Sequence, residues 1–175
     1  TKLVLQGRID FSLSPDQQPM QGLLRTPLLR ERLFLLAHAS VALPRRTLAI
    51  EDFAALPLVL PSLPNTLRAR LDHAFLTAGL TCNLFAEAST SAILIPAVRE
   101  AMAATILPSS AAQPEIAEGS IVAHALDRAL SRELVLCASA SLPPSPAVNR
   151  VIELCQDEIK RLIEDQAWQG CTLLR

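Results

Sequence analysis

The sequence predicts an α/β fold in which strands and helices alternate along most of the chain. Short apolar segments bounded by Pro, Gly and charged residues have the length of buried strands, and longer segments between them repeat apolar residues with helical spacing. Half of the 175 residues are hydrophobic and 19% are charged, so the chain is able to bury a substantial core and is not disordered. This alternation indicates a largely parallel sheet, in one or two pieces.

Eight segments have the character of strands. Alternating or continuous apolar residues define them, and prolines or charged residues separate them. In chain order they span residues 9–14, 23–29, 32–39, 58–60, 81–85, 105–107, 121–126 and 133–138.

A helix is expected over residues 66–78, because Leu67 and Leu71 recur on one of its faces. The residue that caps its start is Asn65 or Thr66, since both types accept hydrogen bonds from the first turn of a helix.

Two further helices are indicated by their termini. One begins near Ser91 and runs to about residue 104, with a kink at Pro96. The other follows Ser145 as its N-cap, with Pro146 at the first helical position. Helical turns are also expected at residues 1–6, 50–55 and 108–110.

The sequence contains no catalytic or metal-binding pattern. The signatures GxSxG, HExxH, GxGxxG and the P-loop are missing, and five glycines in all argue against a Gly-rich phosphate loop. The three histidines, His38, His73 and His124, fall in different predicted elements, where a structural role is the better interpretation. The sequence therefore predicts neither an enzyme nor a site for a metal or a cofactor.

Charge and cysteine content narrow the class of protein further. Lys and Arg number 16 against 17 Asp and Glu, which excludes the cationic excess of a nucleic-acid or membrane-surface binder. No apolar run approaches the roughly 20 residues of a membrane span, and no signal-peptide pattern is present. The four cysteines lack CxxC spacing and are expected to be free, mostly buried thiols of a cytoplasmic protein. Because the first residue is not Met, the chain is expected to be a fragment or a processed product.

The best local candidate for a binding site is the segment 61–66, which joins a buried strand to a helix N-terminus. Free N–H groups at such a terminus suit a carboxylate or a similar anion, aided by the side chains of Asn65 and Thr66. Arg68 and Arg70 would add positive charge. The alternative is that Asn65 and Thr66 only cap the helix.

Four segments, in order along the chain, resemble the effector-binding region of LysR-type transcriptional regulators. They are QGRIDFSLS, GLLRTPLLRERLFLLAHASVAL, FAALPLVLPSLPNTLRARLDHAFLTAG and AVREAMAATILPSSAA, and the resemblance covers essentially the whole chain. Within the family the chain is most similar to the nitrogen assimilation control group, through LVLP, LRARLDHAF and ATILPSSAA. Two glycines of the family are Ala101 and Ala103 here, and because alanine favours helix, the preceding helix is expected to run further.

The resemblance implies a fold like that of type 2 periplasmic binding proteins, with two subdomains joined by two crossover segments. Subdomain one would comprise residues 1–30 and 129–175 and would be truncated at its N-terminus. Subdomain two would comprise residues 31–128. The winged helix-turn-helix that binds DNA in the family is absent from this chain and would precede Thr1.

The resemblance also implies a function, which is to sense a small-molecule effector in the cleft between the subdomains and so control DNA binding and transcription. The effector-binding residues expected at this cleft are Ser12, Ser14, Pro15, Pro64, Asn65 and Thr66. The implied partners are the effector and further copies of the chain, with DNA contacted only through the missing domain and no membrane contact. The alternative is a solute-binding protein of similar fold.

Overall fold

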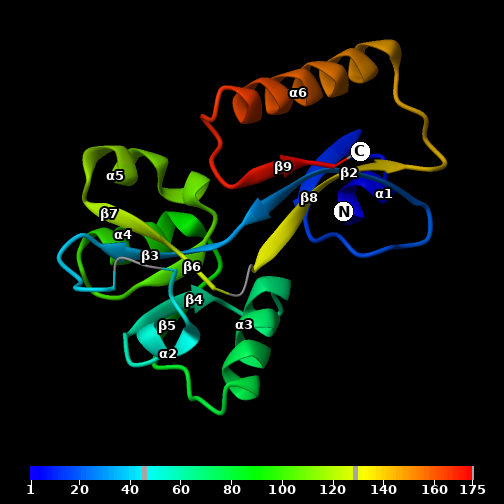
Figure 1. Ribbon diagram of the computed structural model, residues 1–175. Coiled ribbons are helices and arrows are strands. Elements are labelled where there is room, and N and C mark those ends of the chain that lie inside the picture. The colour runs from blue at the N-terminus through cyan, green and yellow to red at the C-terminus, as the bar shows by residue number, and fades with distance from the viewer. Residues whose placement is uncertain (45–46, 128–129, 175) are drawn as a thin grey trace. The chain divides into compact units, whose positions relative to one another are not determined.

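The computed structural model describes residues 1–44, 47–127 and 130–174. These residues form two compact units, each with its own hydrophobic core (Figure 1). Unit 1 comprises residues 1–31 and 131–174, and unit 2 comprises the described residues from Arg32 to Leu130. The chain therefore passes between the units twice, after Glu31 and after Leu130. The boundary expected between residues 128 and 129 lies outside the described residues.

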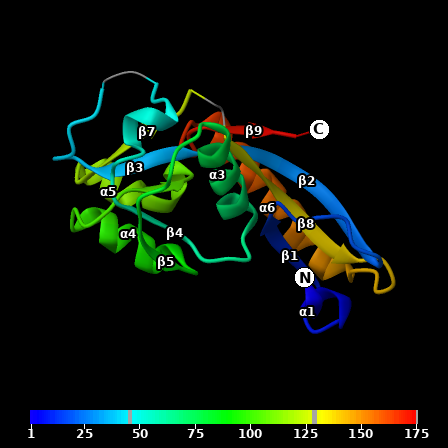
Figure 2. The same ribbon diagram turned by 90° about the horizontal axis from the view of Figure 1, so that it is seen from below.

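Unit 1 is built on a four-stranded sheet with the strand order β1-β8-β2-β9. The bounds of the strands are Phe11–Pro15 for β1, Ser131–Ser139 for β8, Leu23–Arg32 for β2 and Cys171–Leu173 for β9. Helix α6 (Pro146–Glu164) lies along one face of this sheet (Figures 1 and 2). Its Ile159 is buried in one cluster with Leu29 and Leu136, and Trp168 packs against that cluster. The short helix α1 (Lys2–Leu5) contacts β8.

Unit 2 contains two small sheets that share one core. The first has the order β6-β3-β7, with β6 at Thr105–Leu107, β3 at Phe34–His38 and β7 at Ile121–Ala125. The second pairs β4 (Leu58–Pro61) with β5 (Leu84–Ala88). Val59 links the two sheets, because its N–H donates to the carbonyl of Ala104 at 2.9 Å and its carbonyl accepts from the Thr105 hydroxyl at 2.7 Å.

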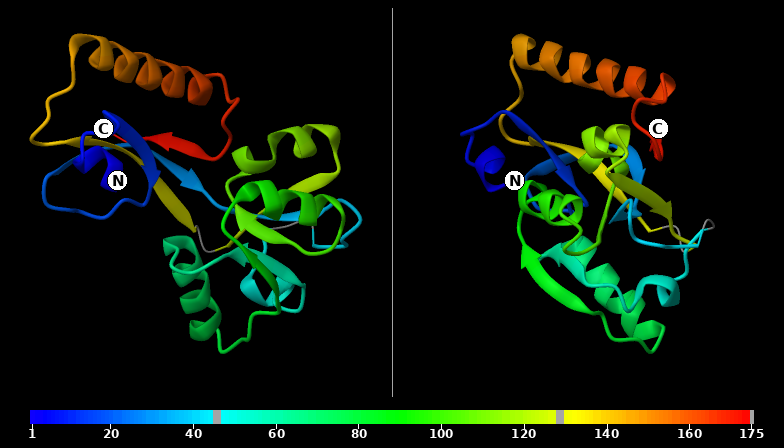
Figure 3. Two further views of the ribbon diagram at one scale, coloured as in Figure 1. Left: turned by 180° about the vertical axis from the view of Figure 1, so that it is seen from behind. Right: turned by 90° about the vertical axis from the view of Figure 1, so that its left-hand side faces the viewer.

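The helices of unit 2 pack on these strands. They are α2 (Ile50–Phe53), α3 (Thr66–Thr77), α4 (Ser91–Arg99), the 3₁₀ helix η1 (Ser109–Ala112) and α5 (Gln113–Glu118). Helix α3 contacts β4, α4 contacts β3 and β4, and α5 contacts β7 (Figure 3). The strands they cover are almost fully apolar, so the core of unit 2 is larger than that of unit 1.

The expectation of a largely parallel sheet is wrong. The pairs β1–β8, β2–β9, β3–β6 and β3–β7 are antiparallel, whereas β4–β5 is parallel. Parallel pairing needs a long crossover connection between the two paired strands, usually a helix, and α3 lies in such a connection between β4 and β5. The antiparallel pairs join strands from distant parts of the chain, and the alternation of elements along the sequence does not reveal those partners.

The individual elements agree closely with the sequence pattern. All eight expected strands are present, with ends shifted by at most three residues. The N-cap of α6 is confirmed, since the hydroxyl of Ser145 accepts from the backbone N–H of Val148 at 3.3 Å. Helix α5 and strand β9 were not expected, because each is too short to show a hydrophobic period.

Helix α4 ends at Arg99, well before the expected end near residue 104. The next residue, Glu100, is its C-cap, and Ala101 adopts the left-handed region with a φ of 56°. The expectation that Ala101 and Ala103 would prolong the helix is therefore wrong. The strand β6 that follows requires the chain to turn here, and this requirement outweighs the helix propensity of alanine.

The turn after α4 has the hydrogen bonds of a Schellman motif. The N–H of Ala101 donates to the carbonyl of Val98, and the N–H of Met102 donates to the carbonyl of Ala97, both at 3.0 Å. The residue in the left-handed position of such a motif is usually glycine, because a Cβ atom there is strained. Ala101 therefore carries a conformational strain that a glycine would relieve.

Replacing Ala101 by glycine is expected to raise the free energy of unfolding by about 1 kcal/mol. An L-residue in the left-handed region costs roughly 1–2 kcal/mol, and the greater freedom of glycine in the unfolded chain offsets part of the gain. Urea unfolding with an unchanged m-value measures the effect.

The matched control is Gly79→Ala at the corresponding position after α3. Gly79 has a φ of 68°, and a Cβ atom there would meet no atom within 4 Å, so only the backbone conformation is tested. This variant is expected to lose about 1 kcal/mol. An Ala101→Gly variant no more stable than the parent would show that the turn is not strained.

Candidate functional site

The segment between β4 and α3 presents polar groups at the surface of unit 2. Strand β4 is buried along its length, whereas Pro64, Asn65 and Thr66 are exposed. Asn65 has an extended backbone, and its side-chain Oδ1 accepts from the backbone N–H of Arg68 at 3.1 Å. Of the two candidate caps, Asn65 is therefore the one that caps α3.

With Asn65 as the cap, the first turn of α3 keeps donors for a ligand. Helix geometry leaves the N–H groups of Thr66 and Leu67 without intrahelical acceptors, and the positive end of the helix dipole lies at the same place. The Thr66 side chain is exposed beside them. This arrangement suits a carboxylate or another small anion.

Arg68 does not supply free positive charge to this loop, contrary to the sequence-based expectation. Its side chain is buried and forms ion pairs with Asp72, at 2.8 Å, and with Glu87 of β5. It also donates to the carbonyl of Pro61 at 3.4 Å. Burial by itself would lower the pKa of Arg68, but its hydrogen bonds to Asp72 and Glu87 outweigh burial and raise that pKa.

The interactions of Arg68 connect the candidate loop, residues 61–66, to the core of unit 2. They connect the first turns of α3 to the carbonyl at the end of β4 and to the carboxylate near the end of β5. The i,i+4 spacing of Arg68 and Asp72 is a signal that the sequence carries. Glu87 lies on a strand further along the chain, so only the fold identifies it as the second partner.

The residues expected on strand β1 lie in unit 1. The hydroxyl oxygens of Ser12 and Ser14 are 3.4 Å apart on one face of the strand, and Pro15 is exposed at its end. Ser12 is opposite the buried Cys137 of β8 in the register of the sheet. Burial raises the pKa of the Cys137 thiol, while Arg25, the N-terminal amine and a hydrogen bond with Ser12 act in the opposite direction.

The six expected effector-binding residues thus form two groups. Ser12, Ser14 and Pro15 are together at the end of β1, and Pro64, Asn65 and Thr66 are together before α3. The first group belongs to unit 1 and the second to unit 2.

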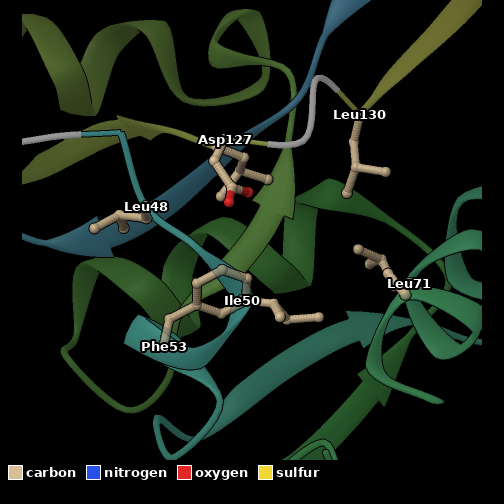
Figure 4. A pocket seen from close by; sticks show the side chains of 8 residues that line it. Leu48, Ile50, Phe53, Leu71, Asp127 and Leu130 are labelled. Atoms are coloured by element: carbon tan, nitrogen blue, oxygen red, sulfur yellow. The ribbon is translucent and has the colours of Figure 1, made fainter. Parts of the chain in front are cut away.

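An apolar cavity within unit 2 contains none of these residues (Figure 4). It measures about 30 Å³, which is room for roughly two water molecules. The residues that line it are Leu48, Ile50, Phe53, Leu71, Ala74, Leu126, Asp127 and Leu130. A space of this size does not hold an organic effector, so the cavity is a packing gap beside α2 and α3.

The histidines and cysteines described below form no metal-binding group among the described residues. The imidazole of His38 is 2.7 Å from the hydroxyl of Ser40 in the turn after β3, and burial lowers the pKa of His124 on β7. The described residues hold no cluster of three His, Cys, Asp or Glu side chains placed to bind a metal ion. The four cysteines are free thiols, of which Cys137 is buried and the others are partly buried. Within the described ranges, the helices are too short or too polar to cross a membrane.

Replacing Arg68 by methionine is expected to lower the free energy of unfolding by about 2 kcal/mol. The methionine keeps the apolar stem but leaves Asp72 and Glu87 without their shared cation and the carbonyl of Pro61 without this donor. Chemical unfolding of unit 2, followed by circular dichroism, measures the loss.

Arg150→Met is the control for this variant, since the Arg150–Glu153 pair on α6 is 63% and 59% exposed. Exposed pairs contribute at most about 0.5–1 kcal/mol, so this change is expected to have little effect. Equal losses in the two variants would contradict the structural role of Arg68.

Comparison with known sequences identifies relatives over most of the chain. The sequence model of the LysR substrate binding domain family matches residues 1–160. The nitrogen assimilation regulatory protein nac of Klebsiella aerogenes is 28% identical over 159 residues, which are 90% of this chain and 52% of that protein. The chain therefore spans about half the length of this relative, and the expected similarity to the nitrogen assimilation control group is confirmed.

Comparison with solved structures gives the fold. The regulatory domain of CcmR from Synechocystis PCC6803, in complex with 2-PG, has a TM-score of 0.76 at 13% identity, over 89% of this chain and 76% of that chain. The cofactor-binding domain of the Cbl transcriptional regulator has a TM-score of 0.75 at 21% identity, over 96% of this chain and 75% of that chain. The expected fold, like that of the periplasmic binding proteins, is thereby confirmed. Since the family's sequence model matches residues 1–160 and its domains share this fold, the chain belongs to the LysR substrate binding domain family.

Proposed function

We propose that this chain is the effector-sensing and oligomerisation domain of a bacterial LysR-type transcriptional regulator. The observation that carries the proposal is the family match over residues 1–160, supported by relatives that are named as regulators. A small molecule would bind in the cleft between subdomain one, residues 1–30 and 129–175, and subdomain two, residues 31–128. A neighbouring domain solved in complex with 2-PG supports small-molecule binding.

The effector-binding residues in this proposal are Ser12, Ser14 and Pro15 from β1 and Pro64, Asn65 and Thr66 from the start of α3. The N–H groups of Thr66 and Leu67 would donate to an anionic or carbonyl oxygen, and the Thr66 hydroxyl would add one hydrogen bond. Because Asp72 and Glu87 neutralise Arg68, this guanidinium would not supply charge to the ligand, and recognition at the loop would rest mainly on backbone amides and hydroxyls.

The effector would act by shifting the equilibrium between open and closed arrangements of the two subdomains. That shift would reposition a winged helix-turn-helix outside this chain, through which the regulator would contact DNA and control transcription. A net charge of -1 supports the view that the domain itself does not bind the duplex. The protein would act in the cytoplasm, without catalysis, and the regulator names of its relatives favour this function over solute binding.

Binding at the proposed loop is tested by substitutions of Thr66. In ¹H–¹⁵N spectra of the domain titrated with 2-PG, acetate and inorganic phosphate, the amides of residues 65–67 are expected to shift with the ligand that binds. Thr66→Ala is expected to weaken binding by up to about tenfold, because one hydrogen bond contributes about 0.5–1.5 kcal/mol.

Thr66→Ser keeps the hydroxyl and is expected to bind like the parent. Because Asn65 is the cap, Thr66→Ala is also expected to leave the free energy of unfolding nearly unchanged, which separates binding from stability. A ligand whose shift changes fall on α6 and β9 instead of residues 12–15 and 64–67 would contradict this site.

Self-association of the domain would use the outer face of α4. Ile93 on this helix is 57% exposed, and Phe85 on the neighbouring strand β5 is 54% exposed. Both side chains leave apolar surface uncovered in unit 2, as an interface with a second copy requires.

Replacing Ile93 by glutamate is expected to weaken association of the domain at least tenfold, because a carboxylate would be buried without a partner. Sedimentation over a range of concentrations measures the dimer dissociation constant. The matched control is Leu76→Glu, since Leu76 on α3 is 76% exposed and lies outside the proposed interface. An equal loss in the control, or none with Ile93→Glu, would exclude α4 as the interface.

A further inference from the structure

The two places where the chain passes between the units are joined by ion pairs. The chain leaves unit 1 after Glu31, at the end of β2, and returns to it at Ser131, at the start of β8. Strands β2 and β8 are neighbours in the sheet. Arg30 contacts Glu133 at 2.9 Å and Glu31 contacts Arg132 at 2.6 Å, so two pairs of opposite polarity connect adjacent residues of the two strands.

The two pairs differ greatly in their exposure to solvent. The side chains of Arg30 and Glu133 are 53% and 36% exposed, whereas those of Arg132 and Glu31 are 25% and 3% exposed. Water screens the first pair, and such pairs contribute little to stability. The carboxylate of Glu31 is buried, and a buried charge that loses its partner carries a desolvation penalty of several kcal/mol.

Arg132 contacts the carboxylate of Glu31 directly, whereas two other neighbours of Glu31 do not offset its charge. Strand β9 places Cys171 opposite Glu31 in the register of the sheet. The pKa of the Cys171 thiol is raised to about 12, by burial first and by the charge of Glu31 second, so the thiol is protonated and neutral at physiological pH. Arg30, the neighbour of Glu31 on β2, is engaged with Glu133.

The pairing of the two segments continues beyond the ion pairs into unit 2. The N–H of Leu33 donates to the carbonyl of Leu130 at 2.8 Å. The guanidinium of Arg32 donates to the carbonyl of Leu126 at 3.2 Å and lies 5.9 Å from the centre of the Phe34 ring. The two passages are therefore paired on both sides of the boundary.

We propose that the Glu31–Arg132 ion pair is a clamp that makes the two crossover strands move as one ribbon. While this ion pair is formed, β2 and β8 bend together when the two units move. With the clamp broken, hydrogen bonds such as that from the N–H of Leu33 to the carbonyl of Leu130 still join the two strands, but the strands open locally more often. The clamp concerns the mechanics of the chain and does not depend on which effector the proposed function requires.

Hydrogen exchange, measured by mass spectrometry, tests the clamp. In Arg132→Gln, which takes this cation away from the buried Glu31 carboxylate, peptides covering residues 29–36 and 130–137 are expected to exchange at least about tenfold faster than in the parent. In Glu31→Gln, which removes the buried charge itself, the same peptides are expected to exchange faster by a smaller factor. Peptides from α3 and α6 are expected to exchange at the parental rate. Arg30→Gln and Glu133→Gln are the matched controls one residue away, and they are expected to change exchange by less than about threefold.

A double variant that swaps the two charged residues tests the clamp even if a single variant folds poorly. The double variant Glu31→Arg with Arg132→Glu restores a pair at the same place and is expected to recover protection to within about threefold of the parent. Faster exchange throughout unit 1, unchanged exchange in the crossover peptides, equal effects of the exposed pair, or no recovery in the double variant would each overturn the clamp.

Discussion

Strand β8 hydrogen-bonds to β1 on one side and to β2 on the other, and through it the two ends of the chain share one sheet. Residues 1–31 alone supply two strands and one short helix, which do not enclose a core. Helix α6 packs on an apolar face that contains Leu29 and Leu136, and this face forms only when residues 131–139 pair between β1 and β2. Unit 1 therefore depends on contacts between residues more than one hundred positions apart in the sequence, and the residues of unit 2 lie between them along the chain.

Two charged residues, Glu31 and Arg68, are buried in this structure. Each has a partner of opposite charge from another element, Glu31 in Arg132 of β8 and Arg68 in Glu87 of β5, and Arg68 also pairs with Asp72 on its own helix. Apolar residues of similar size would pack at these positions at less electrostatic cost. Charged groups specify geometry more strictly, because they tolerate only arrangements that keep their partners. Arg68 fixes the loop before α3, and Glu31 fixes the crossover strands.

The end of α4 shows how a local preference yields to the fold. Alanine at position 101 favours helix, but the chain adopts a left-handed residue there and begins strand β6 four residues later. The burial of Ala103, Ala104 and the β6 residues that follow provides the free energy that holds Ala101 in a strained conformation. The helix face that this turn positions carries the exposed Ile93 of the proposed interface.

The amino-acid sequence by itself determined the local elements of this protein. The hydrophobic period located all eight expected strands, and Ser145 with Pro146 located the start of α6, because such signals act between residues close in the chain. The family resemblance was also visible in sequence segments, and it pointed to the loop at residues 64–66. The cap of α3 could be narrowed to Asn65 or Thr66, since both types form the same hydrogen bond.

Only the tertiary structure decided which strands pair, in what direction, and which charges meet. Antiparallel pairing of β8 with β1, the partnership of Arg68 with Glu87, and the Glu31–Arg132 pair all join residues that no local pattern connects. The choice of Asn65 as the cap and the end of α4 at Arg99 also depend on where the neighbouring strands run. The physical reason is the same in each case. Packing and charge compensation between distant segments involve larger free energies than the local preferences of single residues.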